Sequence, residues 1–298
     1  MTDTVKGIIA IVATCVIWGL SPIYYKALSH VPPLEVLSHR ALWSFLLFAV
    51  ILIVQRRFGQ MFSLIREQPV LMGLAALMIS ANWFLFILSS QIDRSTEASV
   101  GYYIYPLLSV LIGRFVLSEP LSPLKWIAIG LVFTAVTVLT LGLGVVPFVA
   151  LSLAVTFAIY GLIKKGVSAG PVLTVATEVT LVLPLAVIWL AGVHFAGFEG
   201  FKPTTGGAFG SNWRDSILLI CAGPITSIPL LMFSYGARRV SMATTGIAFY
   251  INPTLQFLVA VLIFAEPFGT VHMIAFPMIW AAVILYSVTA IRQDRAAR

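Results

Sequence analysis

Long apolar runs of about twenty residues, separated by short polar segments, recur along the whole chain. Each run has the length that a helix needs to cross about 30 Å of hydrocarbon at about 1.5 Å per residue. The pattern predicts an all-α integral membrane protein with ten transmembrane helices. We expect these helices at Gly7–Leu28, Leu34–Val54, Pro69–Ser90, Ala98–Ser118, Leu124–Leu141, Pro147–Ile163, Pro171–Gly192, Ser216–Gly236, Ala243–Phe264 and Thr270–Ile291.

One segment occurs twice, 147 positions apart. Ala98–Pro106 has its second copy in Thr245–Pro253, and both copies continue through an apolar stretch to a Glu-Pro pair. A proline within each run predicts a helix bent near its centre, because proline removes a backbone N–H and frees a carbonyl. Paired, interrupted helices of this kind are typical of a transporter's binding site. The matched residues include Tyr103 with Tyr250, Pro106 with Pro253, and Glu119 with Glu266.

Five spans per half is an odd number, so the second half must enter the membrane from the opposite side. We therefore expect an inverted repeat of residues 1–143 and 144–298, with the substrate path between the halves and alternating access. Of the 18 Lys and Arg residues, 13 fall on one side of the expected spans, and Lys164 at the end of its span is one of them. Because positive residues accumulate in cytoplasmic segments, both termini are predicted to be cytoplasmic.

Composition narrows the class of protein. Apolar residues make up 60% of the chain and charged residues 10%, with a mean hydropathy of +1.02, whereas a soluble domain carries about 25% charged residues. The net charge of +7 comes from Lys and Arg residues that lie mostly on one side of the expected spans, where they determine membrane topology, so nucleic-acid binding is excluded. Cys15 and Cys221 lie within spans, which leaves no disulfide or metal-ligand pattern. No nucleophile–base arrangement or phosphate loop is present, so we expect no enzyme and no cofactor.

Aromatic and amide side chains gather on the spans that flank the expected path. Trp18 and Tyr25 share one helix face, and Tyr160-Gly161-Leu162 echoes Trp18-Gly19-Leu20. Such groups offer hydrogen bonds to an amino group and aromatic faces to an apolar or cationic moiety. The alternatives are a packing stripe and simple kinks. We expect substrate contacts from Trp18, Tyr25, Asn82, Tyr102, Tyr103, Tyr160, Thr245, Tyr250 and Asn252, and helix kinks at Pro106 and Pro253.

Charged groups inside a membrane are costly and are functional candidates by default. His39 and Arg40 suit a substrate carboxylate, although a structural pairing with Glu35, Asp93 or Glu97 is the favoured alternative. Glu178 is the one carboxylate placed well inside a span, and it is a candidate for proton coupling. It is the repeat counterpart of Arg40, and inversion places the two at opposite depths, so no direct pair is expected. Because its span is otherwise apolar, a gradient-driven carrier is favoured over a proton antiporter.

Glu119 and Glu266 precede prolines at helix ends, and we interpret them as structural. The remaining histidines, His30, His194 and His272, are scattered without ligand spacing, so no metal site is expected.

Several motifs resemble those of the drug/metabolite transporter superfamily, EamA type, and within it the RarD subgroup. They are Trp18–Lys26, Val31–Glu35, His39–Ser44, Gly101–Pro106 and Tyr250–Thr254. The resemblance covers essentially the whole chain. It implies a multi-pass protein of the bacterial inner membrane that exports amino acids or related metabolites, as the similar YddG-type exporters do.

The resemblance also leaves other functions open. RarD members are commonly labelled drug-resistance permeases, so a drug permease of the chloramphenicol type is the alternative function. A non-transporting receptor or assembly partner is a third. The small multidrug transporters of the superfamily rely on an acidic residue in the first helix, which is absent here. The implied partners are a small-molecule substrate and the lipid bilayer, and no motif indicates an oligomeric state.

Overall fold

The computed structural model describes residues 2–118, 121–198, 206–240, 245 and 248–296. Nine of the described helices are long and apolar enough to cross a membrane, and Ile251–Ile263 forms a shorter apolar helix. The described residues thus form the expected ten-helix membrane protein. Its elements are α1 (Asp3–Ala27), α2 (Pro33–Val54), α3 (Gly59–Glu67), α4 (Pro69–Gln91), α5 (Ser95–Leu117), α6 (Pro123–Leu143), α7 (Phe148–Lys165), α8 (Pro171–Phe195), α9 (Trp213–Ala237), α11 (Ile251–Leu258), the π-helix η1 (Val259–Ile263) and α12 (Thr270–Ala296).

Proline marks the start of four of these helices. Pro33, Pro69, Pro123 and Pro171 open α2, α4, α6 and α8. At the first helical position a backbone N–H has no acceptor within the helix, so proline loses no hydrogen bond there, and its fixed φ is already helical. The same residue type that interrupts a helix interior therefore sets where these spans begin.

The two matched proline segments differ from the expected pair of centrally bent helices. Pro106 lies in the interior of α5, which continues through it as one helix. Pro253 lies in the first turn of α11, where proline is tolerated, and the irregular stretch comes later as η1. The start of the expected span Ala243–Phe264 falls mainly on residues outside the described ranges.

The ends of the two matched segments share one backbone feature. Ser118 follows α5 with a φ of 55°, and Ala265 follows η1 with a φ of 52°. These residues are matched in the 147-residue register. Left-handed backbone costs a residue other than glycine about 1–2 kcal/mol, so its presence at both positions is a specific likeness between the two segments.

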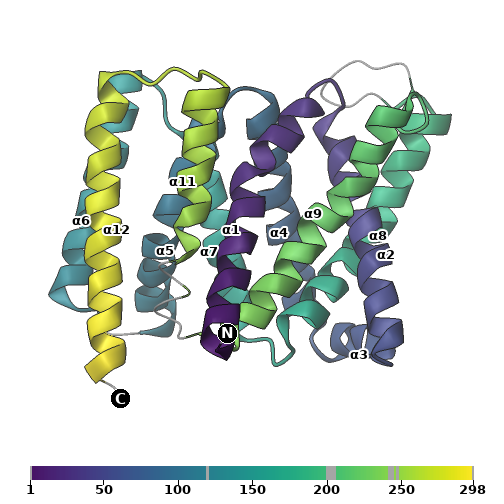
Figure 1. The fold of residues 1–298 in the computed structure, drawn as a ribbon, viewed down its shortest axis with the longest axis horizontal. Helices are drawn as coiled ribbons and strands as arrows, with labels where there is room; N and C mark the ends of the chain where they lie inside the picture. The colour runs from purple at the N-terminus through teal and green to yellow at the C-terminus, as the bar shows by residue number, and fades with distance from the viewer. Residues whose placement is uncertain (1, 119–120, 199–205, 241–244, 246–247, 297–298) are drawn as a thin grey trace.

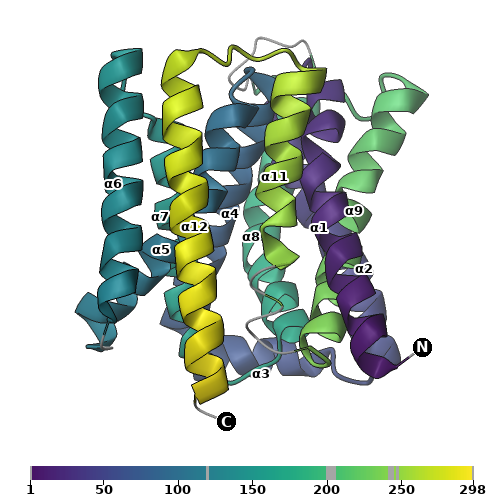
Figure 2. The same ribbon diagram turned by 60° about the vertical axis from the view of Figure 1, so that its left-hand side comes forward.

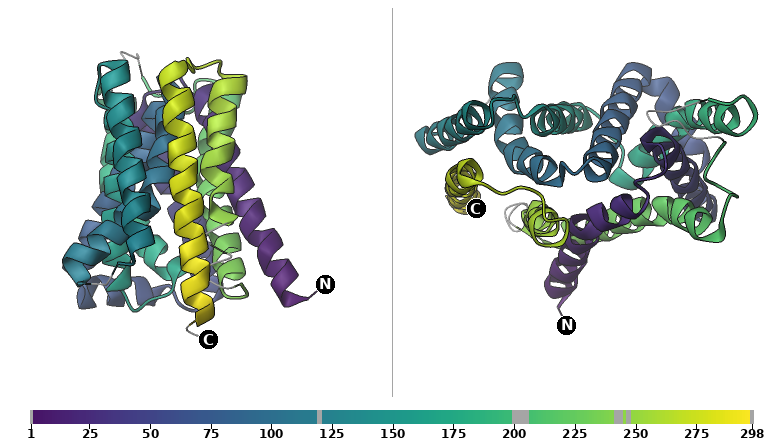
Figure 3. Two further views of the ribbon diagram at one scale, coloured as in Figure 1. Left: turned by 90° about the vertical axis from the view of Figure 1, so that its left-hand side faces the viewer. Right: turned by 90° about the horizontal axis from the view of Figure 1, so that it is seen from above.

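Helix packing follows a pattern expected of an inverted repeat. An inverted repeat pairs each span with the span five places further along the chain, so each contact between spans should have a counterpart. The contact of α5 with α7 has its counterpart in that of α11 with α1, and the contact of α4 with α7 in that of α9 with α1. The contact of α2 with α9 has its counterpart in that of α8 with α4. The pairs α2–α8, α6–α12 and α5–α11 each join counterpart spans. The right panel of Figure 3 shows these helices nearly end-on.

The helix pair α6–α12 forms one end of the molecule, at the left of Figure 1. The two helices pack mainly on each other, and Phe276 and Trp280 of α12 contact Phe257 of α11 through their rings. Outward-facing side chains of α6 such as Phe133 are exposed and apolar. This is the surface expected against lipid tails. α6 thus presents one face to α12 and another to the exterior.

Both termini lie at the same end of the helix bundle (Figure 1), as an even number of spans requires. We call this the terminal end, and the opposite one the outer end. Figure 2 shows α3 lying across the terminal end, and this helix begins at Gly59, inside the expected loop Gln55–Gln60. α3 is amphipathic and buries Met61 and Leu64 in a core shared with α2 and α8.

Candidate functional site

Arg40 of α2 is buried among aromatic residues. Its Nη1 donates to the hydroxyl of Tyr25 on α1 at 2.8 Å, and its guanidinium carbon lies 4.1 Å from the ring centroid of Trp83 on α4. Only 7% of Arg40 is exposed, and no carboxylate of the described residues forms an ion pair with it. Arg40 is therefore a buried cation held by neutral groups.

The expected structural pairing of His39 and Arg40 with outer-end acids is wrong. Glu35 accepts from the backbone N–H of Ala208 at 2.7 Å, and Asp93 pairs with Lys26 at 2.5 Å. Glu97 pairs with Arg94 and also accepts from a backbone N–H at the start of α7. The acids are thus committed to helix starts, a loop and other cations, because backbone N–H groups at those places need acceptors.

His39 contacts the loop that covers the outer end of the bundle. Its ring stacks on Phe209 at 4.9 Å between centroids, and its Nδ1 accepts from Nε1 of Trp43 at 3.2 Å. Phe209 comes from the loop that Glu35 holds, so this loop is fixed to the outer half of α2. The structure therefore separates the roles of His39 and Arg40.

Glu178 of α8 is fully buried and has partners that the sequence did not indicate. Its Oε1 accepts from Nζ of Lys164 at 2.7 Å, and its Oε2 accepts from the hydroxyl of Tyr160 at 3.0 Å. Lys164 also donates to Thr174 of α8. Lys164, counted in the sequence as a topology residue, is thus part of a buried cluster. The available signal was the spacing, because Tyr160 and Lys164 on α7 and Thr174 and Glu178 on α8 are both i, i+4 pairs beside one short turn.

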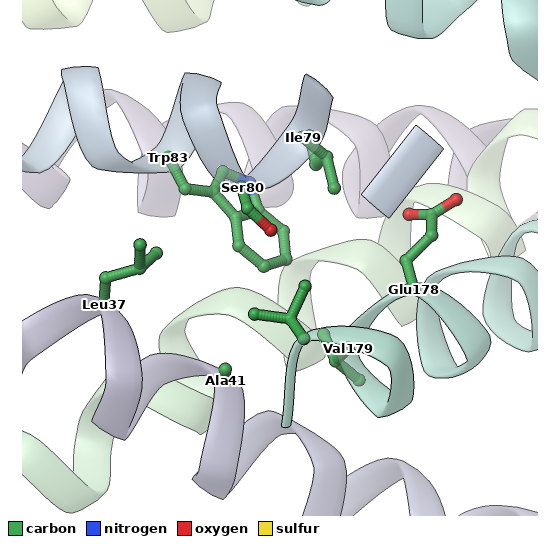
Figure 4. Close-up of a pocket in the computed structure, with 8 residues that line it drawn as sticks. Leu37, Ala41, Ile79, Ser80, Trp83, Glu178 and Val179 are labelled. Carbon is green, nitrogen blue, oxygen red and sulfur yellow. The ribbon is translucent and has the colours of Figure 1, made fainter. Parts of the chain in front are cut away.

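Arg40 and Glu178 do not pair with each other, as expected. Each instead contacts a tyrosine of the preceding span, Tyr25 for Arg40 and Tyr160 for Glu178. A small space lies between Trp83 and Glu178, lined also by Ser80 and by apolar residues of α2, α4 and α8 (Figure 4). It has no room for a water molecule. Glu178 lines this closed space directly, whereas Arg40 reaches it only through its contact with the Trp83 ring.

A continuous series of aromatic rings connects the two charged regions. Tyr25 contacts Phe86, Phe86 contacts Tyr102, Tyr102 contacts Phe157, and Phe157 stacks on Tyr160, with centroid distances of 5.7–5.9 Å. We call these five residues the aromatic ladder. Tyr25, Tyr102 and Tyr160 were expected at the site, whereas Phe86 and Phe157 were not, because they have no polar atom to distinguish them from core residues.

Asn82 lies beside the ladder with its amide satisfied by protein. Its Oδ1 accepts from the hydroxyl of Tyr102 at 3.1 Å, and its Nδ2 donates to the carbonyl of Leu153 at 3.0 Å and to Thr156 at 3.1 Å. Asn82 thus fixes α4 against α5 and α7 and orients Tyr102.

The expected residues on α5 and α11 form a second group. Tyr103 and Tyr250, matched in the repeat, stack on each other with 6.3 Å between centroids, and Tyr103 shares a 2.7 Å hydrogen bond with Thr254. A stack between matched residues is the contact that a two-fold axis between α5 and α11 would produce. Thr245 is half-buried, and its hydroxyl has no partner among the described residues.

Trp18 extends this second group onto α1, and Asn252 belongs to it on α11. Trp18 contacts Phe249 edge-on at 6.2 Å, and Asn252 accepts from Gln256 within its own helix at 2.9 Å. Their neighbour Gly19 packs so closely on α11 that a Cβ there would lie 3.1 Å from the carbonyl of Asn252.

Gly19 has a counterpart in the second half. A Cβ on Gly161 would meet only the hydroxyl of Tyr105, at 3.9 Å. Tyr105 and Asn252 are matched in the 147-residue register, as Gly19 and Gly161 are in the echoed motif. The two glycines thus face matched residues, with a tight contact at Gly19 and an open one at Gly161.

Comparison with known proteins defines the class to which this fold and site belong. The model of the EamA-like transporter family matches residues 5–141. An uncharacterized transporter of Vibrio cholerae is 38% identical over 301 residues, which cover 99% of this chain and 96% of that protein. The chain belongs to the EamA-like transporter family, which is a family of membrane transporters.

Within the family, the relatives indicate the RarD-like group. Protein RarD of Salmonella typhimurium is 35% identical over 98% of each chain. The chloramphenicol-sensitive protein RarD of Pseudomonas aeruginosa is 27% identical over 94% of this chain and 93% of its own. The chain is thus a RarD-like multi-pass protein of the bacterial inner membrane. A solved crystal structure shares its fold, with a TM-score of 0.60 at 17% identity over 97% of this chain and 98% of that one.

Proposed function

We propose that the protein exports amino acids or related small metabolites from the cytoplasm by alternating access. The supporting observation is the environment of Arg40, a buried cation with no carboxylate partner among the described residues. A charge in this position is costly within a bilayer. A guanidinium binds a carboxylate through two parallel hydrogen bonds, so a substrate carboxylate is the partner that this site suits.

The aromatic ladder supplies the second part of the proposed recognition. Its rings lie between the Arg40 region and the Glu178 region, so they would contact the apolar part of a substrate that moves from one region to the other. Aromatic faces also attract an ammonium group. These features favour neutral and aromatic amino acids among the possible substrates.

We further propose that residues 1–143 and 144–298 are the inverted repeats whose exchanged conformations open opposite ends. The exchanged packing pairs, the stack of Tyr103 on Tyr250 and the left-handed residues Ser118 and Ala265 support this division. The closed space beside Glu178 would then belong to a path that opens at one end at a time.

We also propose that transport is gradient-driven and not coupled to protons. Glu178 is the buried carboxylate best placed for coupling, but Lys164 and Tyr160 already occupy both of its oxygens. These hydrogen bonds fix α7 to α8, so a structural role explains the presence of Glu178 without proton coupling.

The test is uptake by proteoliposomes, with each of the twenty amino acids and with amines that lack only the carboxylate. We expect amino acids to be transported and the matched amines to be transported at least tenfold less. Arg40→Gln should lower amino-acid transport at least tenfold, since a hydrogen bond to a charged group contributes about 1.5–3 kcal/mol. Arg40→Lys should retain part of the rate. Arg66→Gln, an exposed change on α3, is the control.

Absence of transport for every amino acid would contradict the proposal. A drug permease is the second candidate, favoured by the aromatic ladder together with the chloramphenicol-sensitive relative. Chloramphenicol has no carboxylate, so its transport should survive Arg40→Gln. Transport of chloramphenicol but of no amino acid, unaffected by this change, would establish the second candidate in place of the first.

A further inference from the structure

A cavity of about 330 Å³ opens at the terminal end of the bundle, apart from the Arg40 and Glu178 regions. It lies where α2 ends, α8 begins and α9 ends. The distribution of Lys and Arg predicts that this end is cytoplasmic. The lining residues are Gln55, Arg57, Gly170, Val172, Leu173, Ser234, Tyr235, Arg238 and Arg239. The volume is that of a small-ligand pocket.

Three arginines line this cavity, and no acidic residue does. Arg57 donates from Nε to Gln60 at 2.9 Å, and Arg239 donates from Nη1 to the carbonyl of Tyr235 at 3.0 Å, so both have neutral partners. Neither these two nor Arg238 forms an ion pair with a carboxylate of the described residues. Three like charges around one cavity repel one another, and a bound anion would relieve that repulsion.

The geometry of the lining suits an anion with several oxygens. Arg239 lies with its guanidinium 3.6 Å from the ring centroid of Tyr235, a contact that holds the planar group in place. Position 170 faces Arg238, since a Cβ built there would lie 3.8 Å from Nη2 of that arginine. Because residue 170 is glycine, the space beside the guanidinium stays open. Guanidinium groups present paired N–H donors that match phosphate oxygens.

The floor of the cavity is apolar as well as polar. Leu173 is buried there, and the buried Ser234 directs its hydroxyl to the carbonyl of Leu230 at 2.8 Å. A charged rim above an apolar floor, at the boundary between spans and cytoplasm, is the arrangement that receives a phospholipid head group. The same rim also suits free phosphate.

We propose that this cavity binds a phosphate group, carried by an anionic phospholipid of the inner leaflet or free in solution. Three segments far apart in the sequence meet at the cavity, so a bound phosphate would join the ends of α2 and α9 to the start of α8. Its binding should therefore stabilise the folded protein.

The test measures the thermal unfolding midpoint of the full-length protein in detergent. The probes are short-chain phosphatidylglycerol, short-chain phosphatidylcholine and inorganic phosphate. We expect phosphatidylglycerol to raise the midpoint with saturation, and phosphatidylcholine to raise it far less. Arg57→Gln and Arg238→Gln should each weaken the apparent affinity at least tenfold. Arg66→Gln, which removes an exposed arginine away from the cavity, should leave it unchanged.

The phosphate arm separates the two sources. Saturable stabilisation by inorganic phosphate, with competition against phosphatidylglycerol, assigns the site to free phosphate, and response to the lipid alone assigns it to the head group. Gly170→Asp provides an internal anion. The backbone at 170 has a φ of −66° and caps α8, a position that aspartate favours. This variant should raise the midpoint without ligand and abolish the response to both probes.

Two results would overturn the proposal. One is the lack of a saturable effect of either probe on the wild-type protein. The other is an equal loss of response in Arg66→Gln and in the cavity variants, which would indicate nonspecific attraction to the basic surface.

Discussion

The pair of Lys164 and Glu178 allows a quantitative test of how this membrane interior holds its charges. Glu178 is fully buried, and the Lys164 side chain is 21% exposed. Glu178→Gln keeps the shape of the side chain but leaves the ammonium of Lys164 without its counter-charge, 2.7 Å from the new amide. Breaking a buried pair on one side costs about 3–5 kcal/mol. Because Lys164 is partly exposed and keeps its bond to Thr174, we expect the lower end, about 3 kcal/mol.

Replacing both partners should cost much less. Lys164→Met with Glu178→Gln removes both charges, and the amide can still accept from Tyr160. Neutral replacements of a buried pair are often without net cost, so the double variant should lie within about 1 kcal/mol of wild type. Lys164→Met alone leaves the buried Glu178 carboxylate without its counter-charge and should also cost about 3 kcal/mol or more. The coupling energy, from a double-mutant cycle measured by denaturant unfolding in detergent, should therefore reach about 5 kcal/mol. Additive effects, with coupling below about 0.5 kcal/mol, would refute the reasoning.

The same cycle provides the control for the proposed mode of energy coupling. A transport defect in Glu178→Gln alone can arise from the stranded lysine. If transport is gradient-driven, the double variant should restore it, and an imposed pH gradient should not drive accumulation in wild type. Driven accumulation in wild type that the double variant lacks would show that Glu178 couples transport to protons.

Two further changes test the closure and packing of the bundle. Glu266→Gln removes a carboxylate that accepts from the N–H groups of Ser95 and Thr96, each at 2.7 Å, so it should weaken the contact between Glu266 and the start of α5 by about 1.5–3 kcal/mol. Faster thiol labelling of a cysteine placed at the start of α5 measures this, and unchanged labelling contradicts it. Gly223→Ala should destabilise the fold by about 1–3 kcal/mol, because its Cβ would lie 2.5 Å from the backbone of α2. Gly130→Ala on α6, where a Cβ has nothing within 4 Å, is the control and should not destabilise the fold. Equal thermal unfolding midpoints for the two variants would contradict this prediction.

The sequence could predict the spans because hydropathy is a local property. Nine described helices cover the expected ranges to within a few residues, and the fold class follows from their number and length. The internal repeat also predicted a contact between distant residues, since it matched Tyr103 with Tyr250 and the two rings stack in the structure. Pro253 shows the limit of matching, because equal positions in a repeat need not have equal places in a helix.

The partners of the charged residues could not be predicted in the same way. Glu97 and Glu266 accept from backbone N–H groups of helices that begin elsewhere in the chain, and the sequence does not mark such groups. Arg40 was expected to pair with an acid on grounds of charge, whereas aromatic rings hold it. Lys164 was assigned to topology because it ends a span, although its length lets Nζ reach back toward Glu178.

The left-handed residue Ala265 has a mechanical consequence for the carboxylate that follows it. Glycine would adopt this backbone without strain, but it would also reach many other conformations at little cost. Alanine is strained in this conformation, so the hydrogen bonds from Ser95 and Thr96 to Glu266 help to hold the turn in place. Ala265→Gly would remove this strain and stabilise the folded protein by about 1 kcal/mol. Under the proposed alternating access, the strain at Ala265 would be released whenever Glu266 separates from the start of α5.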